Sequence, residues 1–364
     1  KSTGLTDWGD PQFLQDVETF IAYANRNPQG TALSRIPLRG DLIRRMTNVL
    51  KLEAAKKSHA DLLSQPIKSP FIVVGLPRTG TTLLQRLLSQ DQAAHGPALW
   101  ELFNPVQVDS KDTDEQRRKA AASFEKTVRS ASEVLWGIHP MLTDEADECF
   151  FLLPQGLGDL VLHQPMEYFD YFMRRSALFD YQMHKQLFQT LHYGKTARRW
   201  VWKSPLHLPK LDEMLTVYPD AQVIWCHRDL SFVLASWFSY TALSRKFVLP
   251  NVDPKKVAAD WVKIWRAALE EAQKARDKRS AGMFFDMSYT DLVNDPIGMI
   301  RRIYRHFGME LSIPAEAKMK AWLDRDKQML KVGHRYTLDQ FGLTVDELET
   351  TFASYLEKYK LSVI

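Results

Sequence analysis

The sequence predicts an α/β fold, because short apolar runs alternate along the chain with helical patterns of apolar residues. The first run, Phe71 to Val74, ends in Gly75 and is followed by Gly80 and an apolar helical pattern. Three later runs have the composition of buried parallel strands, at 200–202, 221–226 and 283–287. We therefore expect a P-loop-like central parallel sheet flanked by helices.

Helices are expected before and after this sheet. Asp10 and Pro11 form an N-cap and a first helical position, and apolar residues follow on one face. Near the other end, Thr344 and Glu347 form a capping-box pattern. No repeat or linker divides the chain, so we predict a single domain (1–364) with helical additions at both ends. Its parts are a helical N-terminal extension (1–65), an α/β core (70–310) and a C-terminal helical segment (311–364).

The composition favours a folded protein with a small anionic ligand. Of the 364 residues, 45% are hydrophobic and 25% are charged, and the formal net charge is +4. The basic residues are scattered rather than striped, which does not favour a nucleic-acid partner. No apolar stretch reaches the 18 residues of an integral membrane segment, and KSTGLTDWGD resembles neither a signal peptide nor a transit peptide. Cys149 and Cys226 are too few for a disulfide framework, so we expect a reducing, cytoplasmic compartment.

Residues at the ends of the predicted strands are the first candidates for a ligand site, because ligands of open α/β sheets gather at the carboxyl edge. Arg78 lies in the glycine loop after the first strand. The other strands are followed by Lys203, by His227 with Arg228, and by Tyr289. Three cationic positions and one aromatic ring indicate a nucleotide with more than one phosphate group.

The glycine loop itself differs from that of a nucleotide triphosphatase. There, a lysine follows the second glycine and reaches the terminal phosphates, whereas here the position holds Thr81 and the nearby cation is Arg78. The run from His227 to Leu230 resembles a protein-kinase catalytic loop, but Leu234 stands where a kinase has asparagine. The loop is therefore expected to hold a phosphate group, but it lacks the lysine with which such loops bind the terminal phosphates of ATP.

The motif GLPRTGTT, followed much later by Arg228 and Ser236, resembles the sulfotransferase family, which uses 3′-phosphoadenosine 5′-phosphosulfate (PAPS) as donor. The chain is most similar to the bacterial branch with PRTGTT or PRSGTT loops, and more distantly to tyrosylprotein sulfotransferases. The resemblance implies that Arg228 and Ser236 hold the 3′-phosphate. It assigns five loop residues to the 5′-phosphosulfate: Arg78, Thr79, Gly80, Thr81 and Thr82.

The resemblance also implies the catalytic residues. Lys203, in WKSPLHL, occupies the position of the family's catalytic lysine and would donate to the bridging oxygen, and no metal is implied. For the base, Glu101 in LWEL is favoured by likeness to the tyrosylprotein enzymes. The alternative is His207, since Pro205 stands where cytosolic members have their histidine.

Two further nucleotide contacts follow from the same resemblance. Tyr289, in SYTDLVNDP, matches a tyrosine that lies against adenine, and Arg335, in GHRYTLDQFGL, matches a late basic residue at the 3′-phosphate. Many cytosolic members also stack adenine on a tryptophan after the loop, but here that residue is Leu83. Adenine stacking must therefore come from elsewhere.

The acceptor is expected to be a small molecule. Large apolar residues are frequent between Trp100 and Trp200, which suits a hydrophobic alcohol, phenol or lipid better than a polysaccharide. The predicted function is sulfuryl transfer from PAPS to a hydroxyl of such a compound. Alternatives are a nucleotide-dependent kinase or other phosphoryl transferase on the same core, and a non-catalytic nucleotide-binding protein. The acceptor's identity and the oligomeric state stay open.

Overall fold

A five-stranded parallel sheet forms the centre of the computed structural model, with the strand order β2-β3-β1-β4-β5. The structure describes residues 3–27, 30–107, 112–155, 158–162, 166–196, 198–326, 337–361 and 363. The strands are β1 (Phe71–Gly75), β2 (Ala94–His95), β3 (Arg199–Lys203), β4 (Gln222–His227) and β5 (Phe284–Ser288). The predicted α/β fold with its parallel sheet is confirmed.

The described residues fall into two compact units, each assembled from separate stretches of the chain. The first comprises 1–67, 97–197 and 244–251, and the second comprises 68–96, 198–243 and 252–364. The sheet belongs to the second unit. The organisation as a single domain stays a prediction.

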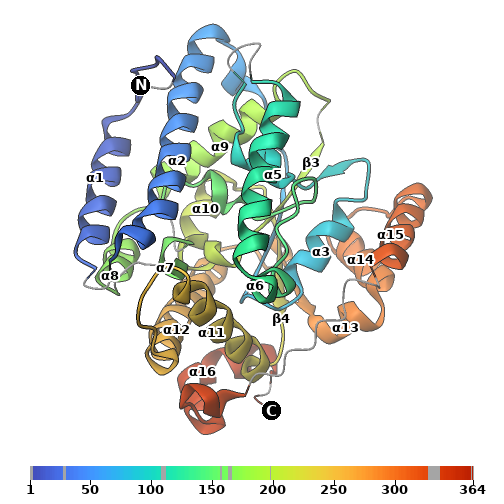
Figure 1. Ribbon diagram of the computed structural model, residues 1–364. Helices are drawn as coiled ribbons and strands as arrows, with labels where there is room; N and C mark the ends of the chain where they lie inside the picture. The colour runs from blue at the N-terminus through green and yellow to red at the C-terminus, as the bar shows by residue number, and fades with distance from the viewer. Residues whose placement is uncertain are drawn as a thin grey trace. The chain divides into compact units, whose positions relative to one another are not determined.

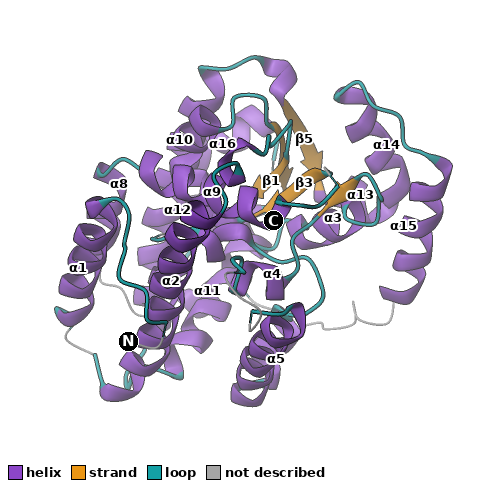
Figure 2. Ribbon diagram, turned by 90° about the horizontal axis from the view of Figure 1, so that it is seen from above, coloured by secondary structure: helices purple, strands orange, loops and turns teal. Residues whose placement is uncertain are grey.

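In the second unit, helices cover both faces of the sheet (Figure 2). Apolar residues of all five strands form one core cluster with four helices, α3, α13, α14 and α15. On the other face, Trp202 and Trp225 are fully buried, as are Trp261 and Trp265 of α12. The helices of this unit are α3 (Thr81–Leu88), α10 (Leu211–Val217), most of α11 (Leu230–Lys246), α12 (Pro254–Asp277), α13 (Tyr289–Asn294), α14 (Pro296–His306), α15 (Ile313–Asp326) and α16 (Val345–Tyr359), with 3₁₀ turns η3 (Pro205–Lys210), η4 (Ala281–Met283) and η5 (Leu338–Phe341).

The strand order creates a switch point between β1 and β4. The connection from β1 through α3 leads to β2 on one side of the sheet, and the connection from β4 through α11 and α12 leads to β5 on the other. A crevice at the carboxyl ends of two such strands is where open α/β sheets bind their ligands. The fold therefore directs attention to the residues that follow Gly75 and His227.

The first unit is helical (Figure 1). Arg175 joins two of its helices, because Nη2 lies 2.7 Å from Asp16 Oδ2 on α1 and Nη1 lies 2.5 Å from Asp180 Oδ2 on α9. The helices and 3₁₀ turns are α1 (Pro11–Asn25), α2 (Ala32–Ser58), η1 (Leu62–Ser64), α4 (Leu99–Phe103), α5 (Asp114–Ala131), α6 (Glu133–Ile138), η2 (Cys149–Leu152), α7 (Gly158–Leu162), α8 (Met166–Arg174) and α9 (Leu178–His192).

Local sequence signals explain several of these boundaries. The Asp10 side chain accepts a hydrogen bond from Gln12 N at the start of α1, and Thr344 and Glu347 form the predicted capping box of α16. In the described part of the chain, no helix combines the length and the apolar composition that crossing a bilayer requires.

Candidate active site

The loop after β1 is shaped by two glycines and one strained arginine. Gly75 has φ +144°, and a Cβ at this position would lie 2.4 Å from the carbonyl oxygen of Cys226 on the neighbouring strand β4. Gly80 has φ +88° and forms the N-cap of α3. Between them, Arg78 has φ +69°, a conformation that non-glycine residues seldom adopt. The backbone conformation at these three positions therefore determines the shape of the loop.

This loop presents the amino end of α3 to the carboxyl edge of the sheet. Gly80 has no side chain that could accept from the first N–H groups of the helix, and Thr79 donates its hydroxyl to the Leu76 carbonyl at 2.6 Å. Unsatisfied N–H groups at a helix start attract anions. Thr81 and Thr82 are the first two residues of this helix. The arrangement can bind a phosphate or sulfate group.

Arg228 brings the second cation to this loop. It follows β4, and its Nη1 donates to the main-chain carbonyl of Arg78 at 2.9 Å. Its guanidinium carbon lies 3.8 Å from the ring centroid of Tyr289 and 3.6 Å from that of Phe232. Burial lowers the pKa of Arg228, and the positive charge of Arg78 lowers it further. A bound anion would relieve both costs.

Tyr289 and Ser236 complete this group of predicted residues. Tyr289 is the first residue of α13, and its Cδ2 would lie 2.8 Å from a Cβ placed on Gly80. Its ring therefore lies between the glycine loop and Arg228. Ser236 is buried on α11 one helical turn beyond Phe232, and residues four apart share a helix face.

Lys203 ends β3, the neighbour of β1, and is fully buried. The register pairs it with Val73, two residues before Gly75. Residues two apart on a strand share a face, and Val201 packs in the core cluster with α3. Lys203 consequently projects from the α3 side of the sheet.

His227 links the end of β4 to neighbouring elements. Its Nε2 lies 3.0 Å from Asp286 Oδ1, its Nδ1 lies 2.7 Å from the Tyr355 hydroxyl, and its ring stacks on Tyr359 at 4.1 Å. Arg276 binds the two carboxylate oxygens of Asp286 at 2.6 and 2.8 Å. Burial lowers the pKa of His227, so the imidazole is neutral and donates Nε2–H to the carboxylate, while Nδ1 accepts the tyrosine proton. His227 therefore anchors α16 and β5 to the strand that carries Arg228.

The two candidate bases have different surroundings. His207 lies in η3, where the chain bends after Ser204, and complete burial lowers its pKa to about 3. Glu101 is buried in α4 of the first unit, where Oε2 accepts from Ala98 N at 2.9 Å and Oε1 lies 3.9 Å from Lys195 Nζ. Arg335 lies outside the described residues. The roles predicted for all three stay predictions.

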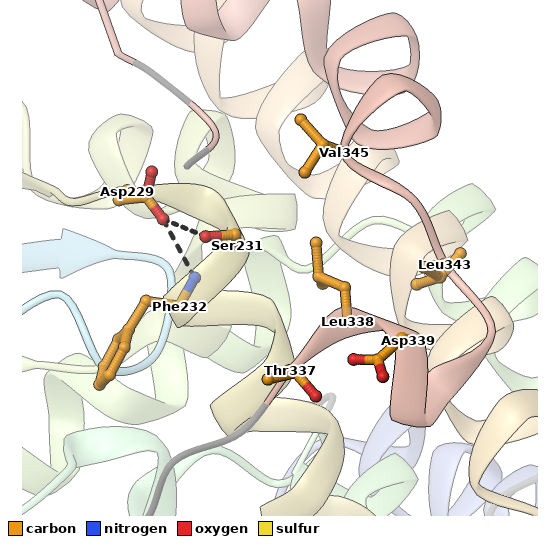
Figure 3. A pocket seen from close by; sticks show the side chains of 8 residues that line it. All are labelled: Asp229, Ser231, Phe232, Thr337, Leu338, Asp339, Leu343 and Val345. Carbon is orange, nitrogen blue, oxygen red and sulfur yellow. Dashed lines mark hydrogen bonds between the residues drawn. The ribbon is translucent and has the colours of Figure 1, made fainter.

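A pocket of about 570 Å³ lies beside the start of α11 (Figure 3). Asp229 caps this helix, because its Oδ1 accepts from the Phe232 main-chain N at 3.1 Å and from the Ser231 hydroxyl. The pocket is lined by Asp229, Ser231, Phe232, Thr337, Leu338, Asp339, Leu343 and Val345. The sequence analysis did not single out Phe232, although an aromatic residue four positions after Arg228 on a helix was a usable signal.

The fold and these strand ends define an α/β protein with a glycine loop after β1 and a second arginine at the switch point. Comparison with known proteins then gives the family: the model of the sulfotransferase family matches residues 70–312. The chain belongs to this family and is a sulfotransferase.

Named relatives agree with this assignment. The omega-hydroxy-beta-dihydromenaquinone-9 sulfotransferases Stf3 of Mycobacterium bovis and Mycobacterium tuberculosis are each 27% identical over 288 residues, or 76% of this chain and 71% of theirs. The crystal structure of sulfotransferase STF1 from Mycobacterium tuberculosis is 29% identical with a TM-score of 0.84, covering 96% of this chain and 95% of that one. The structure of STF9 from Mycobacterium avium is 26% identical with a TM-score of 0.89, covering 100% and 95%.

Proposed function

We propose that this sulfotransferase moves a sulfuryl group from PAPS to the hydroxyl of a small apolar acceptor. The observation that carries the proposal is the hydrogen bond from Arg228 to the Arg78 carbonyl, which joins two anion-binding strand ends. PAPS carries two charged ends on one adenosine. Two linked cationic sites with the Tyr289 ring between them match that distribution of charge.

The loop after β1 is assigned the 5′-phosphosulfate. Arg78 supplies positive charge, Gly80 permits the close approach of the group, and the amino end of α3 supplies N–H donors. Thr79 maintains the loop through its bond to the Leu76 carbonyl. Thr81 and Thr82 open the helix, and we assign their N–H and hydroxyl groups to the same anion.

The site after β4 is assigned the 3′-phosphate. Arg228 is the principal ligand, because a guanidinium binds phosphate through parallel hydrogen bonds. Ser236 is assigned a contact to the same phosphate, and so is Arg335. Tyr289 is assigned to the adenine, since its ring lies against the glycine loop and beside Arg228.

The transfer needs one bond to form and one to break. The acceptor oxygen bonds to sulfur while the bond from sulfur to the 5′-phosphate oxygen breaks, and the acceptor's proton leaves to a base. Lys203 is proposed to donate to the departing bridging oxygen, and Arg78 to stabilise charge on the transferring group. We propose that protein cations suffice for this and that the reaction needs no metal.

Glu101 is proposed as the base, with His207 as the alternative. Complete burial lowers the pKa of His207 to about 3. Glu101 is preferred on the likeness of LWEL to the tyrosylprotein enzymes. Loss of the true base should lower turnover by about 10²–10⁴. Turnover by Glu101→Gln and His207→Gln separates them, because only one substitution should have the large effect. A large loss in H207Q with near-normal E101Q would reverse the assignment.

Two observations support an apolar acceptor: the many large apolar residues between Trp100 and Trp200, and the similarity to the Stf3 enzymes. Those relatives are named for a hydroxylated dihydromenaquinone, a lipid-like acceptor. We propose a hydroxylated apolar compound for this protein as well, and a cytoplasmic location.

Binding of 3′-phosphoadenosine 5′-phosphate (PAP) tests the proposal against its alternatives. Calorimetry with PAP and with ATP, each with and without magnesium, should show PAP binding tighter in both conditions. Tighter binding of ATP with magnesium would indicate a kinase or another phosphoryl transferase. Tight PAP binding without turnover of PAPS on a broad panel of apolar alcohols and phenols would indicate a non-catalytic binder. Loss of turnover with a metal chelator would contradict the metal-free transfer.

A further inference from the structure

Arg228 is enclosed by two aromatic rings. Its guanidinium carbon lies 3.6 Å from the Phe232 ring centroid and 3.8 Å from the Tyr289 centroid. Two rings at these distances cannot share one face of a single guanidinium, so they cover its two faces. All five guanidinium N–H donors lie in one plane, and they point outward between the rings.

Phe232 is held in this place by its own helix. Asp229 caps α11 and accepts from the Phe232 main-chain N at 3.1 Å. In Figure 3 the Phe232 ring points away from Leu338 and Asp339, which line the pocket. The ring is 39% exposed, so the Arg228 guanidinium that it covers lies near the surface of the protein.

The two rings have different parts in nucleotide binding. Tyr289 also lies against Gly80, where the nucleoside must approach, and it is assigned to the adenine. Phe232 lies on the other face of Arg228, on the helix that also carries Ser236. An arginine side chain loses considerable rotational freedom when it is fixed on a ligand, and a ring that fixes it beforehand lowers this cost.

We infer that Phe232 is a positioning residue that fixes the Arg228 guanidinium for the 3′-phosphate and so sets the preference for nucleotides that carry this group. The inference rests on the proposed PAPS specificity. It predicts that removal of the ring weakens binding of PAP and leaves binding of adenosine 5′-monophosphate (AMP), which lacks the 3′-phosphate, unchanged.

Calorimetry with PAP and AMP on the full chain tests this. Phe232→Leu keeps the apolar volume and removes the ring, and it should weaken PAP binding by about tenfold with AMP binding unchanged. Phe232→Tyr should retain the wild-type PAP affinity. Phe247→Leu is the matched control, because Phe247 is similarly exposed, at 40%, and comes directly after the last residue of α11. This control should bind both nucleotides normally.

A double-mutant cycle separates positioning from general damage to the fold. In the background of Arg228→Ala, Phe232→Leu should have no further effect on PAP affinity, because the group that the ring positions is gone. Equal losses for PAP and AMP in F232L, or additive losses in the double variant, would overturn the inference. Wild-type protein that binds PAP no better than AMP would instead overturn the proposed function, together with this inference. A preference for PAP over AMP that is as large in F232L as in the wild type would overturn the inference alone.

Discussion

The carboxyl ends of β1 and β4 both lead into an arginine, but the two ends are built differently. After β1 the backbone determines the shape, through Gly75, Gly80 and the positive φ of Arg78. After β4 side chains determine it, because rings enclose Arg228 and His227 is bonded on both nitrogens. The first end can surround an anion with N–H groups. The second presents one cation stacked between rings, which we propose binds the 3′-phosphate.

Among variants at these strand ends, the largest effect is expected on the strand beside the backbone-built end. Lys203→Met removes the donor proposed for the leaving oxygen and should lower kcat by about 10²–10³ while PAP affinity stays near the wild-type value. Single-turnover assays with PAPS, paired with calorimetry, measure both quantities. Lys203→Arg is the matched variant that keeps the charge. Near-normal turnover by K203M would place the chemistry elsewhere.

Arg228→Ala tests the side-chain end. PAP binding should weaken by about 1.5–3 kcal/mol, because a charge-assisted phosphate contact is lost, whereas AMP binding should barely change. Arg266→Ala, an exposed arginine on α12 that pairs with Glu270, serves as control and should change neither affinity. Equal losses of affinity for PAP and AMP would show that Arg228 does not bind the 3′-phosphate.

Gly80→Ala tests the backbone end. Alanine at φ +88° costs about 1–2 kcal/mol, and its Cβ would press on Tyr289. PAP and AMP should therefore both bind more weakly, in contrast to Arg228→Ala, since both carry a 5′-phosphate. Calorimetry on the same two nucleotides compares the variants. Weaker binding of PAP with unchanged binding of AMP would mean that the loop does not hold the 5′-phosphate.

A smaller effect should appear in the dependence of stability on pH. Burial would raise the pKa of Asp286, but hydrogen bonds from Arg276 and His227 and the charge of Arg276 hold it well below its ordinary value. The pKa of His227 is lowered by burial in a site formed also by Tyr355, Tyr359 and Trp225. Both groups take up protons more readily in the unfolded chain, so stability should fall as pH drops below about 6.5.

Urea denaturation between pH 7.5 and pH 4.5 measures this loss. His227→Gln removes one of the titrating groups, and its stability should decline less over this range, by about 1 kcal/mol. An identical decline in the variant would show that His227 does not contribute to the pH dependence.

The sequence predicted the sheet because its strands are buried and apolar. The runs at 200–202, 221–226 and 283–287 lie within a residue of β3, β4 and β5, and the helix starts after Asp10 and Thr344 carry the expected caps. Strand β2 was missed because two residues, Ala94 and His95, carry no pattern. Local sequence patterns thus identify elements that bury a long apolar face. They do not identify a short strand such as β2, which is stabilised by its pairing with the rest of the sheet.

The part of the site that one continuous motif forms was predictable from the sequence. The part that the fold assembles from distant residues was not. The glycine loop can be identified from adjacent residues. The contacts of Arg228 with Tyr289, and of His227 with Asp286 and Tyr355, join positions 59 to 128 residues apart. Such partners depend on strand order and on the placement of α16. No local pattern contains that information.

A crystal structure of the protein with bound PAP tests the central claim most directly. The account predicts the Arg228 guanidinium at about 2.7–2.9 Å from oxygens of the 3′-phosphate, and the 5′-phosphate at the amino end of α3. A nucleotide bound in the opposite direction, or one with its 3′-phosphate far from Arg228, would contradict it.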